Sequence, residues 1–155
     1  MAALLAVIFN ARAASLQPSA EKSVFYHTME TGSIDDINAQ LDKLKTSILK
    51  EKDGYEGALL MKKAGLVHLP AEKLKYFKAG RRKLEAALLQ DKDNIELHFL
   101  RLTIEEHAPK IVRYHDDIEQ DRQIVIKGFK QLPAAAKEAV LNYTKTSKVL
   151  HTGDF

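Results

Sequence analysis

The stretch AEKLKYFKAGRRKLEAALLQDKDNIELHFLRLTIEEH, residues 71–107, decides the fold class. Its first part, residues 71–90, places apolar side chains and one arginine along a single helical line: Leu74, Phe77, Arg81, Leu84 and Leu88. A polar turn follows at residues 91–94, and residues 95–107 then carry apolar side chains around most of a second helix, which we expect to be the most buried. Two helices joined by so short a turn predict an antiparallel helical hairpin.

Five further stretches have helical patterns, at residues 19–30, 33–48, 55–65, 109–132 and 133–150. Ser33 and Asp36 resemble a capping box at the start of the second of these, and Gly32 is expected to adopt the left-handed conformation just before it. Ile48 and Ile111 are expected to face inward. Gly57, Ala58, Ala64 and Gly65 lie along one side of residues 55–65, where small side chains are expected to let a neighbouring helix come close. The sequence therefore predicts one all-α domain over residues 19–150, a stack of antiparallel hairpins with about six or seven helices, and a flexible tail at residues 151–155.

Composition excludes several classes of chemistry. A chain of 155 residues without cysteine cannot form disulfides, zinc–cysteine sites or iron–sulfur clusters. Its six histidines show no spacing of three or four to a second ligand, which a metal site on one helix requires. The sequence contains no nucleophile motif, no phosphate-binding glycine loop and no apolar run long enough to span a membrane. We therefore expect no enzymatic activity, no cofactor and no metal.

The N-terminus suggests an export signal over residues 1–14. Residues 2–9 are apolar, and Ala11-Arg12-Ala13 has the small-x-small pattern of a signal-peptidase site, although the positive n-region is missing. An ordinary apolar helix start is the alternative. The first interpretation predicts a periplasmic or secreted protein, and the second a cytoplasmic one.

Charge is unevenly distributed along a chain whose formal net charge is only +3 at pH 7. Residues 62–83 hold eight bases and one acid, whereas residues 91–121 hold nine acids and four bases. These blocks are either solvated helix faces or a two-signed surface for a partner. The basic block, with Tyr76 and Phe77 as stacking groups, also raises nucleic-acid binding as an alternative, against which the acidic block argues.

Arg81 and Arg101 are the most informative charged residues, because each lies beside an apolar helical stripe. A buried guanidinium needs a carboxylate or an anionic ligand to offset its lost hydration. Glu85 and Glu105 each follow one of these arginines by four residues, which predicts an internal network of salt bridges. The alternative is a groove that holds a small anion, or an enzyme acting on one, lined by four residues: Arg81, His98, Arg101 and Glu105.

Residues 80–104 resemble a junction between tetratricopeptide repeats. Gly80, Leu84 and Ala87 have the spacing of the small, large apolar and alanine residues of that repeat. Asp91 and Asn94 match the turn that follows in the repeat. The sequence departs from that family at Lys92, His98 and Leu102, where the repeat has Pro, Trp and Gly. No period near 34 residues repeats along the chain. The resemblance implies stacked helical hairpins that bind a peptide or protein.

The segments GALLMKKAG (residues 57–65) and FLRLTIEEHAPK (residues 99–110) also resemble an uncharacterised Bacteroidetes-type family of secreted or periplasmic helical proteins. This second resemblance, over residues 37–125, implies a compartment but no reaction. Together the patterns predict a non-catalytic helical protein of the bacterial envelope. Its partner is expected to be a peptide, a protein or a second copy of the chain.

Overall fold

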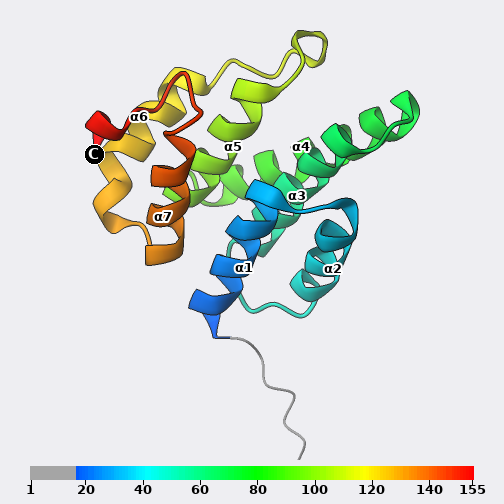
Figure 1. Ribbon diagram of the computed structural model, residues 1–155, viewed down its shortest axis with the longest axis horizontal. Helices are drawn as coiled ribbons and strands as arrows, with labels where there is room; N and C mark the ends of the chain where they lie inside the picture. Colours follow the sequence, from blue (N-terminus) through cyan, green and yellow to red (C-terminus); the bar gives the residue numbers. More distant parts are fainter. Residues whose placement is uncertain (1–16) are drawn as a thin grey trace, which may run out of the picture.

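The computed structural model describes residues 17–155, and every regular element in that range is helical (Figure 1). Its α-helices are α1 (Pro18–Thr31), α2 (Ile34–Leu44), α3 (Lys52–Leu66), α4 (Pro70–Gln90), α5 (Ile95–His107), α6 (Ile118–Gly128) and α7 (Ala134–Tyr143). Single turns of 3₁₀ helix occur at Lys110–Val112, Phe129–Gln131 and Thr152–Asp154. The predicted all-α fold of about seven helices is confirmed. The predicted signal at residues 1–14 lies outside the described residues.

No helix in the described range combines the length and apolar character needed to cross a bilayer.

Two helix starts are fixed by side-chain caps. The Ser33 hydroxyl oxygen accepts from the Asp36 amide at 3.2 Å, and the Ser33 amide donates to the Asp36 carboxylate at 2.8 Å, which confirms the capping box of α2. At α5, Asn94 accepts from the Leu97 amide. Gly32 differs from the prediction, because its φ is −61°. A Cβ there would lie 2.5 Å from the Thr28 carbonyl oxygen, so glycine is required by a close approach of the backbone.

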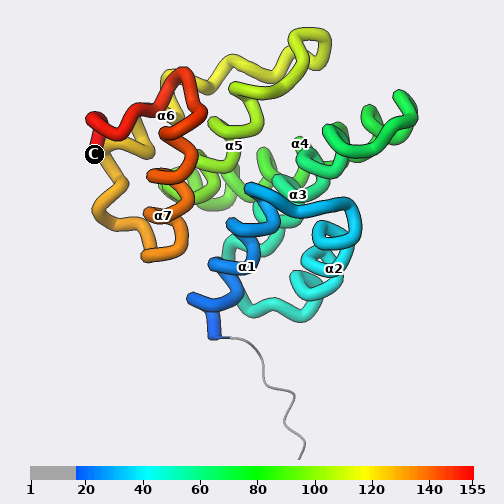
Figure 2. The backbone as a smooth tube through the Cα atoms, viewed as in Figure 1, coloured from blue at the N-terminus to red at the C-terminus, as the bar shows by residue number. Residues whose placement is uncertain are grey.

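Helix α5 runs through the middle of the molecule, as the tube in Figure 2 shows. Eight of its 13 residues are buried, which confirms the sequence-based expectation. On one side of it the core contains the rings of Phe25 and Tyr55, stacked with centroids 3.7 Å apart and planes within 6°. This aromatic stack joins α1 to α3.

Helices α3 and α4 share the most extensive helix–helix contact in the described chain, and glycines allow them to approach closely. A Cβ on Gly80 would lie 2.5 Å from the Gly57 carbonyl oxygen, and a Cβ on Gly57 would lie 2.6 Å from the Leu84 amide nitrogen. Both contacts are with backbone, which cannot give way as a side chain can. The expectation that small residues on α3 admit a close neighbour is therefore confirmed at Gly57, whereas Gly65 faces open space.

The paired helices extend beyond the rest of the molecule. In Figure 1 the connection between α3 and α4 lies at the upper right, away from the other helices. The buried residues of α4 are Gly80, Leu84 and Leu88, all in its second half. Leu74, predicted to face the core, is 48% exposed. The first half of α4 thus forms a projecting arm with α3.

The helix predicted over residues 109–132 is interrupted, and this prediction was wrong. After α5 the chain makes one 3₁₀ turn and a loop, and α6 begins only at Ile118. Arg113 has φ 47°, the left-handed conformation, which a continuous helix does not allow. Ile111, predicted to face inward, is 90% exposed. Polar contacts of the loop with Glu85 of α4 and Glu105 of α5 replace some of the missing helical hydrogen bonds.

Two other predicted helices end early. Helix α2 stops at Leu44, so Ile48 lies in a loop and is 82% exposed. Helix α7 stops at Tyr143, although it was predicted to reach residue 150.

The segment 151–155, predicted as a flexible tail, forms a 3₁₀ turn whose Asp154 pairs with Arg122 at 3.0 Å.

The close approach of α3 and α4 predicts opposite effects for two glycine substitutions. Gly80→Ala should lower the free energy of unfolding by about 2 kcal/mol despite alanine's better helix propensity, because the added methyl group meets backbone atoms. The control Gly65→Ala, in the same hairpin, should raise it by about 0.5 kcal/mol, since nothing lies within 4 Å of its Cβ. Urea denaturation of both variants measures this. Equal effects would contradict the proposed packing.

Candidate functional site

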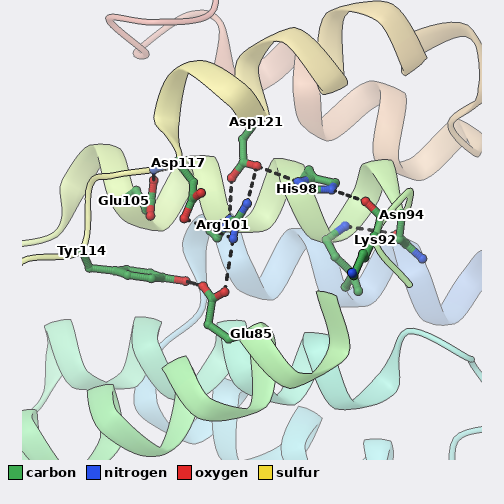
Figure 3. A network of polar contacts seen from close by, with 10 residues as sticks. Glu85, Lys92, Asn94, His98, Arg101, Glu105, Tyr114, Asp117 and Asp121 are labelled. Atoms are coloured by element: carbon green, nitrogen blue, oxygen red, sulfur yellow. Dashed lines mark hydrogen bonds and ion pairs between the residues drawn. The ribbon is translucent and has the colours of Figure 1, made fainter. Parts of the chain in front are cut away.

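Three of the four predicted groove residues lie together on α5. His98, Arg101 and Glu105 are three and four residues apart, so they share one face of the helix, and all three are buried. Figure 3 shows this face turned towards α6 and towards the loop that precedes it. The sequence therefore identified a real cluster of polar residues in the core.

Arg101 is held by carboxylates from two other helices and a loop. Its Nε and Nη2 donate to the two oxygens of Asp121 on α6, both at 2.8 Å. Its Nη1 lies 3.2 Å from Glu85 on α4 and 3.2 Å from Asp117, just before α6. A bidentate guanidinium–carboxylate pair is among the strongest polar contacts in proteins, and here it is nearly dry. Arg101 thus ties α4, α5 and α6 together (Figure 3).

His98 extends the same cluster. Its Nδ1 lies 2.6 Å from Asp121 and its Nε2 lies 2.7 Å from the Lys92 carbonyl oxygen, so both ring nitrogens face acceptors. Burial lowers the pKa of His98, but the hydrogen bonds to Asp121 and Lys92 outweigh burial and leave the pKa above its ordinary value. The imidazole is therefore fixed at both nitrogens and has no free position for proton transfer.

Glu105 lies at the other end of the cluster and is fully buried. Its Oε2 accepts from the Asp117 amide at 3.1 Å, whereas its Oε1 has no hydrogen-bond partner among the described residues. Burial, followed by the negative charges of Asp117 and Asp121, raises the pKa of Glu105 to about 7. The ion pair expected between Glu105 and Arg101 is not present in the described part of the chain, because Asp121 takes that place.

Arg81 does not join the other three. It is exposed, contrary to the expectation of a buried stripe, and its guanidinium stacks 4.5 Å from the centre of the Tyr114 ring. The Tyr114 hydroxyl in turn donates to Glu85, the residue that contacts Arg101. Arg81 is thus linked to the cluster only through two intermediate side chains.

The sequence did not identify the partners that matter most to Arg101. Asp117 and Asp121 belong to the acidic block at residues 91–121, and the continuous helix predicted over residues 109–132 gave no indication that they contact Arg101. The signal that could have found Asp121 is its place between the apolar positions Ile118 and Val125, on the inner side of α6. An acidic residue on an apolar stripe needs a buried cation.

A second buried cluster also escaped sequence reasoning. The ammonium of Lys22 on α1 contacts the Glu96 carboxylate of α5 and lies 3.4 Å from Glu51. The Tyr26 hydroxyl donates to the Glu96 carboxylate at 2.8 Å, and the Tyr55 hydroxyl donates to the same carboxylate. Burial raises the pKa of both phenols, so both remain neutral donors. These contacts join α1 and α3 to α5.

The charged side chains of the Arg101 cluster pair with one another. Around Arg101, three carboxylates of the chain occupy the guanidinium donors, and Glu105 adds a further acid whose pKa is near neutrality. Within residues 17–155, no group of three or more histidine, aspartate or glutamate side chains has an arrangement suited to a metal ion. The arrangement therefore stabilises the contact between helices.

Comparison of the chain with protein-family models, with curated proteins and with solved structures gives no match in any of the three. The resemblance to tetratricopeptide repeats and to the envelope family stays a prediction.

The raised pKa of Glu105 predicts a pH dependence of stability. The folded chain binds the Glu105 proton more tightly than the unfolded chain does. Protonated Glu105 therefore stabilises the fold fully below about pH 4.5, and this contribution is lost as the pH rises through about 7. Glu105→Gln should therefore raise the free energy of unfolding by about 2 kcal/mol near pH 8 and by much less near pH 5.

Urea titrations at both pH values measure the effect. Glu119→Gln, an exposed glutamate on α6, is the matched control and should change stability little at either pH. A gain for Glu105→Gln that is the same at both pH values would contradict the assignment, and so would a loss near pH 8.

Proposed function

We propose that the protein is a non-catalytic binding module whose partner is a peptide or another protein. The paired state of Arg101 supports this over an anion site, because a bound anion would have to displace Asp121, Glu85 or Asp117. The cluster also holds more acidic than basic side chains, so an incoming anion would be repelled. The bacterial envelope is part of the proposal, on the strength of the sequence pattern alone.

Two open grooves run beside α2. The first, about 210 Å³ in volume, lies between α1 and α2, and its walls include Val24, His27, Gln40 and Lys43. The second, about 330 Å³, lies between α2 and α3. Both are shallow and mix polar with apolar side chains. Such walls suit an extended segment of polypeptide, which presents backbone amides and side chains in alternation.

The unpaired carboxamide of Gln40 is the observation on which the proposal rests. This side chain lines the first groove and is 2% exposed, yet neither its amide nitrogen nor its amide oxygen has a hydrogen-bond partner among the described residues. A buried polar atom without a partner costs about 1–3 kcal/mol of stability. A carboxamide has an NH₂ group that donates and a carbonyl oxygen that accepts side by side, which matches the C=O and N–H of a peptide backbone. A peptide in the groove would supply both missing partners once the Gln40 side chain, which is buried in the free protein, turns towards it.

Replacing Gln40 by leucine should separate stability from binding. Gln40→Leu keeps a similar volume and removes the two unpaired atoms, so the free energy of unfolding should rise by about 1–2 kcal/mol. Peptides selected from a displayed random library on the wild-type protein should lose most of their affinity for the variant. Isothermal titration with the selected peptides measures this loss.

Gln131→Leu is the matched control, because Gln131 is exposed in the 3₁₀ turn after α6, far along the chain from α2. It should bind the selected peptides as the wild type does. The proposal would be contradicted by a library that yields no binder, or by binders whose affinity Gln40→Leu leaves unchanged.

A further inference from the structure

The outer end of the α3–α4 arm combines exposed leucines with lysines. This arm tip, residues 62–78, carries Leu66 at 39%, Leu69 at 62% and Leu74 at 48% exposure. Leu66 ends α3, Leu69 lies in the connection, and Leu74 is in the first turns of α4. Large apolar side chains on one projecting end expose an area that water solvates poorly, which marks an interaction surface.

The charge around these leucines is almost entirely positive. The arm tip has a single acidic residue, Glu72, beside five lysines: Lys62, Lys63, Lys73, Lys75 and Lys78. The three lysines on α4 are exposed. A partner for this surface must therefore be anionic and must also accept apolar side chains.

Shape favours a lipid surface over an acidic polypeptide. The arm tip is convex, because the first half of α4 has no buried residue and the hairpin end stands away from the other helices (Figure 1). A peptide is bound in a groove, whereas a convex end with leucines surrounded by lysines fits a soft, planar layer. The leucines can enter the acyl boundary while the ammonium groups remain at the level of the lipid phosphates.

The aromatic side chains argue against nucleic acid as the partner. Binding of single strands needs aromatic faces on which bases stack. The Tyr76 ring is covered by the Lys63 ammonium, 4.4 Å from its centre, and the Phe77 ring packs edge-on against Tyr114 at 5.8 Å. Both rings are partly buried and already have a partner within the described chain. The large apolar side chains that are exposed in this segment are Leu66, Leu69 and Leu74.

We propose that the arm tip of α3 and α4 docks the protein onto an anionic membrane surface, with Leu66, Leu69 and Leu74 entering the interface and the lysines contacting lipid phosphates. This surface lies apart from the groove between α1 and α2, so the proposal does not depend on the peptide-binding function. It describes a peripheral contact and no spanning segment.

Co-sedimentation with lipid vesicles tests the docking. The wild-type protein should bind vesicles of three parts phosphatidylcholine to one part phosphatidylglycerol, bind pure phosphatidylcholine at least about tenfold more weakly, and detach in high salt. The double variant Lys73→Gln/Lys75→Gln should reduce the partition coefficient roughly thirtyfold. Leu69→Ser should reduce it about tenfold. All three positions are exposed, so the variants should remain folded by circular dichroism.

The matched controls lie elsewhere on the surface. Lys130→Gln/Lys145→Gln removes the same charge, and Leu89→Ser removes a leucine that is 71% exposed at the other end of α4. Both should bind within about twofold of the wild type. Equal losses in tip and control variants would overturn the proposal, and so would equal binding to the two kinds of vesicle or no binding to either. A single-stranded oligonucleotide or a polyglutamate peptide that binds when the vesicles do not would also overturn it.

Discussion

The contact of Arg101 with Asp121 is the constraint on which most of the fold depends. Arg101 lies on the central helix and is 7% exposed, so its charge can be tolerated only beside carboxylates. Asp121, at 0% exposure, brings α6 against α5, and Glu85 brings α4 to the same guanidinium. The direction of α6 and the path of the loop before it follow from the need to deliver these acidic groups.

The same requirement explains the irregular segment between α5 and α6. A helix that continued from residue 109 would have carried Tyr114 and Asp117 past the cluster. The left-handed turn at Arg113 instead allows the Tyr114 hydroxyl to reach Glu85 and the Asp117 amide to reach Glu105. The energy of these polar contacts offsets the lost helical hydrogen bonds. The irregular path of this segment also leaves Ile111 exposed, although the helical pattern of the sequence predicted that this apolar residue would lie in the core.

Polar groups inside the fold thus serve the contact between helices, and the features open to a partner lie outside it. The cluster around Glu96 joins α1 and α3 to α5 in the way that the Arg101 cluster joins α4 and α6 to α5. Gln40 is different, since it is buried at the wall of a groove with both amide atoms unpaired. The arm tip is different in another way, because it exposes leucines that no described helix covers.

Local patterns in the sequence predicted the features that local forces decide. The cap at Ser33 was predicted correctly because residues within one helical turn determine it. The apolar pattern of α5 and the small side chain at Gly57 also predicted burial and a close neighbour, although the helices that contact them lie elsewhere in the chain. The spacing of four residues between Arg101 and Glu105 predicted a pair that did not form. Asp121, distant in sequence, offers two aligned oxygens, and a local spacing rule contains no information about such a tertiary partner.

A double-mutant cycle between Arg101 and Asp121 tests the central claim most directly. Arg101→Met should lower the free energy of unfolding by about 3–5 kcal/mol, because it leaves buried carboxylates without their cation. In the Asp121→Asn background the same change should cost at least about 2 kcal/mol less, since one of those charges is already gone. The contradicting result is a loss of stability in the double variant that equals the sum of the losses in the two single variants within about 0.5 kcal/mol. Arg101 and Asp121 are then not coupled, and the account of how α4, α5 and α6 are held together is wrong.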